Sequence, residues 1–170
     1  MFKYFLTALL IAFIEELFFR GVLMYDLLKQ RHTILAVLLS SVVFMLLHFI
    51  AVNPIPPTEA NWYYGLQALL FGIPQKYDLL TVIQAGSALF IAGVFLALIR
   101  IVTQHIIPCI GIHCGWVFGV KMNKKMTDFQ SGSEYASLVS SYDHFIGWGA
   151  AIWFGLFVIW ILYRIKQHNQ

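Results

Sequence analysis

The stretch of sequence that decides the fold is LLTVIQAGSALFIAGVFLALI, residues 79–99, which contains no Asp, Glu, Lys or Arg. An α-helix of about 20 such residues is long enough to cross the ~30 Å hydrocarbon core of a bilayer. Windows equally free of these charged residues recur at 32–58, 101–120 and 144–163. The pattern predicts a membrane protein with several spanning helices.

The composition of the 170-residue chain supports the same conclusion and excludes other classes of protein. Hydrophobic residues make up 60% of the chain and charged residues 11%, whereas ordinary globular domains carry about 25% charged residues. The net charge of +3 is small and spread along the chain, so nucleic acid is not an expected partner. The sequence contains no Gly-rich phosphate loop, which removes the basis for nucleotide chemistry. The predicted environment is the lipid bilayer.

We expect one all-α domain over residues 1–170, a polytopic membrane helix bundle. Its five predicted spanning helices cover residues 4–28, 33–52, 79–103, 106–120 and 145–163. A short re-entrant or interfacial helix is expected at 65–73, after a proline-rich segment that cannot continue the second span. Residues 121–143 are polar and are predicted to form a loop. Lysines and arginines divide evenly between the two sides, so the positive-inside rule assigns no orientation. The oligomeric state is not predicted.

The first predicted span contains three charged side chains within six positions, Glu15, Glu16 and Arg20. Each charge at the centre of a spanning helix costs about 2.5–3.5 kcal/mol on insertion scales, so these groups must be paired, solvated or neutralised. Glu16 and Arg20 are four residues apart on one helix face and can form an ion pair, which is equally consistent with a structural role. Glu15 lies about 100° round the helix from Glu16. It has no such local partner, which predicts a functional site.

Histidines occupy the middle of two other predicted spans. His48 lies in the second span, and His113 lies in the fourth between Gly111 and Gly115, two glycines expected to let another helix approach closely. Either histidine alone is best interpreted as an interhelical hydrogen-bonding group. Because three spans each carry ionisable groups near their midpoints, we expect these groups to converge in a polar cavity. Carboxylates and imidazoles in one cavity serve acid–base catalysis or metal ligation.

Three stretches follow one another in the order Glu15-Glu16-x-x-x-Arg20, Phe44-x-x-x-His48 and His113. Together they resemble the CPBP family of intramembrane proteases, which includes the Ras-converting CAAX endopeptidases and many bacterial relatives. The family pattern is EExxxR on one helix, FxxxH on the next long helix and HxxxN on a later one. The resemblance covers roughly residues 8–122 and is specific because all three motifs lie inside hydrophobic spans. The asparagine of the last motif is replaced here by Val117.

The resemblance implies a role for each matched residue. Glu15 is the carboxylate that activates the attacking water, while His48 and His113 polarise the water and the oxyanion. The residues with supporting roles are Glu16, Arg20 and Phe44. The implied substrate is a membrane-anchored peptide or protein, such as one with a C-terminal sorting or CAAX-like segment. The implied location is the bacterial cytoplasmic (inner) membrane, with a multi-pass chain.

Two chemistries stay open for Glu15, His48 and His113. In the first, no cofactor is needed and the site is a metal-free, glutamic-type protease. In the second, the three residues bind zinc and a water molecule takes the fourth position, as in a metalloprotease. Two alternatives to an enzyme are also open: a non-catalytic membrane scaffold or immunity protein, and an ion-coupled transporter subunit.

Overall fold

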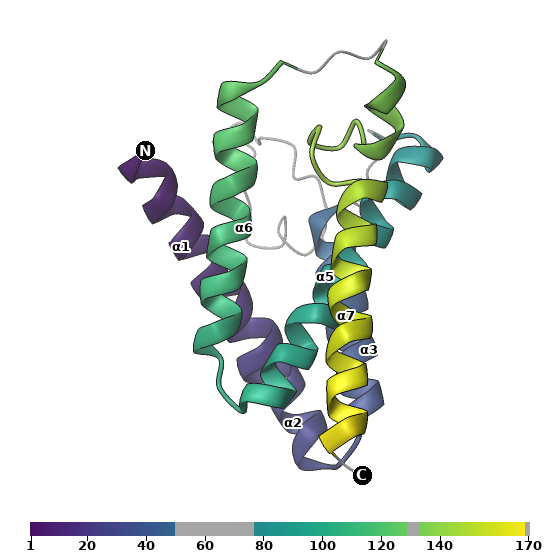
Figure 1. Ribbon diagram of the computed structural model, residues 1–170. Coiled ribbons are helices and arrows are strands. Elements are labelled where there is room, and N and C mark those ends of the chain that lie inside the picture. Colours follow the sequence, from purple (N-terminus) through teal and green to yellow (C-terminus); the bar gives the residue numbers. More distant parts are fainter. Residues whose placement is uncertain (50–76, 129–132, 169–170) are drawn as a thin grey trace, which may run out of the picture.

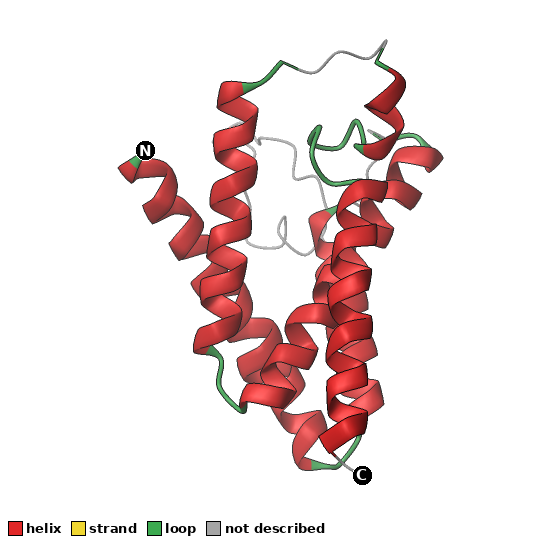
Figure 2. Ribbon diagram, in the orientation of Figure 1, coloured by secondary structure: helices red, strands yellow, loops and turns green. Residues whose placement is uncertain are grey.

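The computed structural model describes residues 1–49, 77–128 and 133–168. All regular structure within these ranges is helical, which confirms the predicted all-α class (Figure 2). The short helix predicted at 65–73 lies outside the described residues, as does the end of the predicted second span.

The first predicted span forms three consecutive helical segments rather than one uniform helix. The α-helix α1 (Phe2–Glu16) continues directly into the π-helix η1 (Leu17–Leu23) and then into α2 (Met24–Lys29). In a π-helical turn each backbone hydrogen bond spans one residue more than in an α-helix, which makes the turn wider. Such turns are frequent at functional sites. Here the widened segment begins immediately after Glu16 and contains Arg20.

The remaining helices are α3 (Thr33–His48), α5 (Leu79–Thr103), α6 (Ile107–Met126), the 3-10 helix η2 (Glu134–Leu138) and α7 (Trp148–His168). The prediction of a loop over residues 121–143 was wrong in two places. The helix α6 continues to Met126, and η2 interrupts the rest. The extension is physically reasonable because Lys124 and Lys125 lie in the last turn of α6, where cations interact favourably with the helix dipole.

The helices form two packed groups, α1 with α6 and α3 with α5 and α7 (Figure 1). The two groups meet where η1 contacts α3 and where α5 contacts α6. The end of the bundle that carries the α2–α3 corner also carries the last turns of α5 and α7. The N-terminal turn of α1 and the end of α6 lie at the opposite end.

Close contact between α3 and α5 depends on Gly93. A β-carbon at Gly93 would lie 3.0 Å from both the Cα and the Cβ of Ser41 on α3. The prediction that Gly111 and Gly115 admit a neighbouring helix is not met within the described residues, where a β-carbon at either position would meet no atom within 4 Å. Both glycines are on the exposed face of α6, so the close approach occurs on a different helix from the one expected.

Large apolar side chains cover much of the outward surface of the helices. Large exposed hydrophobic side chains include Ile14, Leu35, Trp153 and Ile159, a pattern that suits contact with lipid rather than water. Among the described residues, two helices, Leu79–Thr103 and Trp148–Gln167, are long and apolar enough to cross a membrane. The helix Thr33–His48 is apolar but shorter. These helices support a membrane protein, while the count of five spans stays a prediction.

Candidate active site

Glu16 and Arg20 form a fully buried ion pair where α1 becomes η1. Arg20 donates from Nη1 to Oε1 of Glu16 at 2.9 Å, and both side chains have 0% exposure. The pairing predicted from the four-residue spacing is therefore present. A buried charge is strongly unfavourable without a partner, so each of these two residues requires the other.

Arg20 also connects its own helix to two others. It donates from Nη2 to the backbone carbonyl of Gly93 on α5 at 2.9 Å. Its guanidinium lies 5.0 Å from the ring centroid of Phe44 on α3, within the range of a cation–π interaction. Because these contacts are on three helices, Arg20 fixes the rotation of the segment that carries the two glutamates.

His113 on α6 lies between the two glutamates. Its Nδ1 is 2.8 Å from Oε1 of Glu16, and its Nε2 is 3.8 Å from Oε2 of Glu15. An ionised carboxylate can only accept a hydrogen bond, so Nδ1 is the donor to Glu16. The bond to Glu16 thus leaves Nε2 as the ring nitrogen that faces Glu15.

The two glutamates differ in their access to solvent. Glu16 is completely buried and its Oε1 is already shared between Arg20 and His113, whereas the Glu15 side chain is 29% exposed. Within the described part of the chain, Oε2 of Glu15 is buried and has no hydrogen-bond partner, so the exposed part of this side chain lies elsewhere. Glu15 is therefore the carboxylate of the two that a water molecule or a substrate can reach.

His48 on α3 is half-buried and held by local contacts. Its Nδ1 lies 2.8 Å from the backbone carbonyl of Phe44, to which it donates. The Phe44 ring lies between the two imidazoles, with centroid distances of 4.5 Å to His48 and 5.8 Å to His113. Tyr142 donates from its hydroxyl to the backbone carbonyl of His48 at 2.9 Å.

The two histidines open on the same cavity of about 190 Å³, at the junction of α3, α5, α6 and the segment before α7. Val117 lines this cavity as well, so the position where the family motif has asparagine belongs to the site. The other lining residues are Leu89, Trp116, Val120, Lys121, Lys124 and Ile146. The structure thus brings His48 and His113 to one cavity and places Glu15 beside His113.

Sequence reasoning missed the two lysines of the cavity. Lys124 follows His113 by eleven residues, which is close to three full helical turns and places both on one face of α6. That spacing could have predicted that Lys124 lies on the same side of the helix as His113. It was not used because residues 121–143 were expected to form a loop. Lys124 also lies 4.0 Å from the carboxylate of Asp143, in the segment before α7.

The zinc alternative requires the donor atoms of Glu15, His48 and His113 to surround one point. Within the described residues, no group of three or more His, Cys, Asp or Glu side chains is arranged to hold a metal ion. A catalytic zinc site requires three such ligands around one point. The arrangement of Glu15, His48 and His113 does not meet this requirement, so no step of the chemistry below passes through a metal.

A comparison with known protein families matches residues 1–119 to the family described as type II CAAX prenyl endopeptidase Rce1-like. The chain belongs to the Rce1-like family. The match includes every residue of the three motifs and ends before Lys121. No match was found among curated proteins or among solved structures. Membership of the Rce1-like family agrees with the resemblance to CPBP proteases and implies a CAAX-type endopeptidase that acts on membrane-associated substrates.

Proposed function

We propose that this Rce1-like chain is a multi-pass intramembrane endopeptidase of the bacterial cytoplasmic membrane, with Glu15 as its general base. One observation carries the proposal: Oε2 of Glu15, a buried oxygen on a partly exposed side chain, lies 3.8 Å from Nε2 of His113. The opposite nitrogen of that ring is held by the Glu16–Arg20 pair. A base and an oriented imidazole side by side are the requirement for hydrolysis of a peptide bond.

The proposed reaction begins when Glu15 accepts a proton from a water molecule. The water oxygen forms a bond to the carbonyl carbon of the peptide, and the electron pair of the C=O bond moves to the oxygen. As the C–N bond breaks, Glu15 returns the proton to the leaving amine. The products are a new carboxyl terminus and a new amino terminus, with Glu15 restored to its initial state.

His113 and His48 have complementary roles in this proposal. With Nδ1 donating to Glu16, His113 directs Nε2 toward the reaction centre, and the doubly protonated ring donates from Nε2 to the oxyanion. His48 has its own Nδ1 engaged by the Phe44 carbonyl and uses Nε2 to hold the water or the substrate carbonyl. Both rings are thereby oriented before substrate binds, which reduces the reorganisation needed in the transition state.

The lysines of the cavity support a substrate with a carboxylate close to the scissile bond. Lys121 lines the same cavity as the two histidines and makes no ion pair with a described residue, whereas Lys124 lies beside Asp143. An unpaired ammonium group next to the reaction centre favours an anionic partner. We propose that this partner is the C-terminal carboxylate of a membrane-anchored polypeptide, so that cleavage releases a short C-terminal peptide.

The proposal is tested by cleavage of a lipid-anchored peptide in proteoliposomes. The wild type is compared with Glu15→Gln, His48→Ala and His113→Ala, each checked for a wild-type thermal unfolding curve. We expect Glu15→Gln to abolish turnover and each histidine variant to lower it at least about 100-fold, the lower range for loss of one acid–base or oxyanion group. Wild-type activity should persist after treatment with a zinc chelator. Full turnover by folded Glu15→Gln would contradict Glu15 as the general base, and the absence of cleavage by folded wild type would favour a non-catalytic scaffold.

A further inference from the structure

A second and larger cavity lies far from the glutamates, between the last turns of α5 and α7. Its volume is about 730 Å³. Two groups of side chains line it: Ile99, Ile101 and Val102 from α5, and Trp160, Ile161, Arg164, Ile165 and Gln167 from α7. The walls are therefore apolar apart from one cation and one amide. The cavity shares no residue with the active-site cavity.

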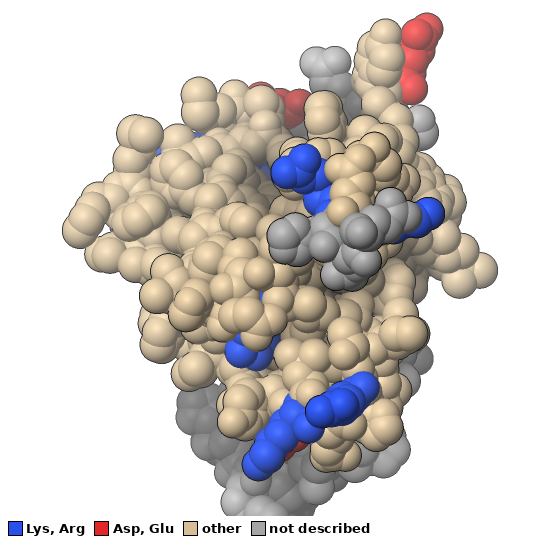
Figure 3. All heavy atoms as spheres, turned by 60° about the horizontal axis from the view of Figure 1, so that its bottom comes forward, with Lys and Arg blue, Asp and Glu red and all other residues tan. Residues whose placement is uncertain are grey.

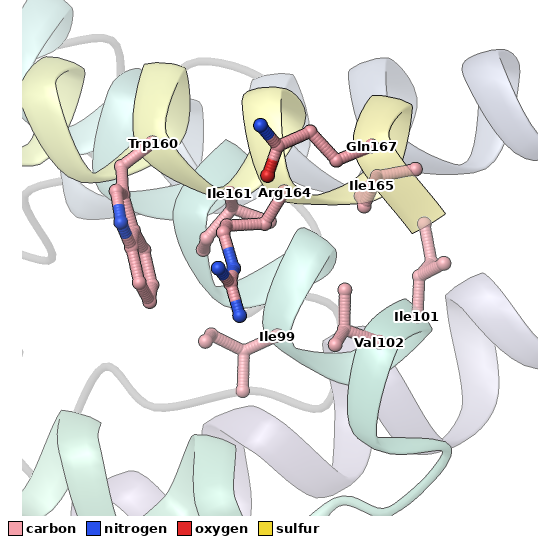
Figure 4. Close-up of a pocket in the computed structure, with 8 residues that line it drawn as sticks. All are labelled: Ile99, Ile101, Val102, Trp160, Ile161, Arg164, Ile165 and Gln167. Carbon is pink, nitrogen blue, oxygen red and sulfur yellow. The ribbon is translucent and has the colours of Figure 1, made fainter. Parts of the chain in front are cut away.

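Arg164 extends from α7 into this cavity toward Ile99, and Trp160 extends beside it (Figure 4). No acidic residue lines the cavity. Gln167 is engaged with Tyr163, to which it donates a hydrogen bond at 2.6 Å. Arg164 makes no ion pair with any residue that the structure describes. A guanidinium group carries five donors, and that of Arg164 lies in a groove with apolar walls that is open to the surface.

The positive charge at the end of the bundle that carries the last turns of α5 and α7 favours binding of an anion. The described basic residues of this end are Lys29, Arg31, Arg100, Arg164 and Lys166, against the single acidic residue Asp26. In Figure 3, where this end is turned toward the viewer, Lys and Arg side chains stand out on a largely uncharged surface. The described charges of the opposite end balance, with Lys3, Lys121, Lys124 and Lys125 against Asp78, Asp128, Glu134 and Asp143.

We propose that the cavity between α5 and α7 binds one anionic phospholipid. The phosphate of the headgroup binds the guanidinium of Arg164, which can form two parallel hydrogen bonds to it. The first part of an acyl chain lies along Ile99 and Val102. Trp160, an amphipathic ring of the type found at the headgroup level of membranes, covers the glycerol region. A phosphate attached to hydrocarbon matches both the guanidinium and the apolar walls of this cavity.

The proposal is tested by native mass spectrometry of the purified full chain with phosphatidylglycerol or phosphatidylcholine of identical acyl chains. We expect the wild type to retain phosphatidylglycerol about fivefold more strongly, the factor given by one basic side chain near an anionic lipid surface. Arg164→Gln should remove this preference. Lys166→Gln is the matched control, because Lys166 belongs to the same basic end but does not line the cavity, and it should keep the preference.

A second variant and a soluble competitor complete the test. Val102→Trp fills the cavity without changing charge and should remove the bound lipid, while its thermal unfolding shows that the chain folds. Inorganic phosphate should not displace the lipid, because it lacks the acyl chain. Displacement by inorganic phosphate at the same concentration would show a simple anion site and overturn the proposal. Equal retention of both lipids by the wild type, or unchanged preference in Arg164→Gln, would also overturn it.

Discussion

His113 and Glu16 are joined by a 2.8 Å hydrogen bond between Nδ1 of the imidazole and Oε1 of the carboxylate, both buried. The two residues are 97 positions apart and lie on α6 and α1, the two helices of one packed group. The bond directs the Nδ1 proton of His113 at Glu16 and turns Nε2 toward Glu15. The two adjacent glutamates therefore have different roles, since Glu16 orients the imidazole of His113 and the side chain of Glu15 stays partly exposed.

Replacement of Arg20 should destabilise the fold rather than only the activity. Arg20→Met leaves the buried Glu16 carboxylate without its cation and removes the hydrogen bond to Gly93. Breaking a buried ion pair by removing one partner costs about 3–5 kcal/mol. We expect the thermal unfolding temperature in detergent to fall accordingly, and the double variant Glu16→Gln/Arg20→Met to recover part of the loss. An exposed control, Lys166→Met, should leave the unfolding temperature unchanged, and an equal loss there would refute the assignment.

Two glycine substitutions should have opposite effects. Gly93→Ala places a β-carbon against the backbone of Ser41, which cannot move without shifting α3, so overpacking should cost about 1–3 kcal/mol. Gly115→Ala meets no atom of the described chain within 4 Å and should stabilise α6 by up to about 1 kcal/mol, the difference in helix propensity. Thermal unfolding of the two single variants distinguishes them. Loss of stability in Gly115→Ala alone would contradict the described packing.

Lys121 should determine how well the enzyme binds a substrate with a free carboxyl terminus. Lys121→Gln removes the unpaired ammonium from the cavity, and we expect KM for such a peptide to rise about tenfold, equivalent to about 1.4 kcal/mol, with kcat little changed. The same peptide with an amidated terminus should be cleaved equally by wild type and variant. The control is Lys125→Gln, on the same helix but outside the cavity lining. A similar effect on both peptides would rule out carboxylate recognition.

Tyr142 should make stability depend on pH only in strongly alkaline solution. Burial, with a smaller contribution from Tyr77, raises the pKa of Tyr142 to about 12, above the ordinary value of about 10. The folded chain therefore disfavours the phenolate, so the stabilisation is complete below about pH 10 and is lost as pH rises toward 12. Unfolding measured between these values should show a smaller decline for Tyr142→Phe than for the wild type. An identical decline would contradict this role.

The sequence predicted the parts of this structure that depend on local spacing and on the cost of burying charge. The pair of Glu16 and Arg20 followed from four-residue spacing on one helix, and the all-α class followed from long windows without charge. The proximity of Glu15 to His113 followed from a different argument. Ionisable groups on three spans each cost free energy on membrane insertion, and this cost is reduced when the groups meet in one polar site.

Other features were beyond the reach of that reasoning because they depend on tertiary contacts. The π-helical segment contains Arg20, whose contacts to Gly93 and Phe44 are encoded by no local pattern. The four-residue spacing of Gly111 and Gly115 predicted close helix packing on α6, but the close approach is between α3 and α5 at Gly93. The lysines of the cavity were overlooked because the polar end of α6 resembles a loop in composition.

The central claim is that Glu15 activates water for peptide hydrolysis. The most direct measurement is cleavage of a lipid-anchored peptide by proteoliposomes in water labelled with the heavy oxygen isotope, followed by mass spectrometry of the products. Wild-type enzyme should place one labelled oxygen in the new carboxyl terminus, and folded Glu15→Gln should give no product. Labelled product from Glu15→Gln at the wild-type rate, or wild-type product without the label, would contradict the claim.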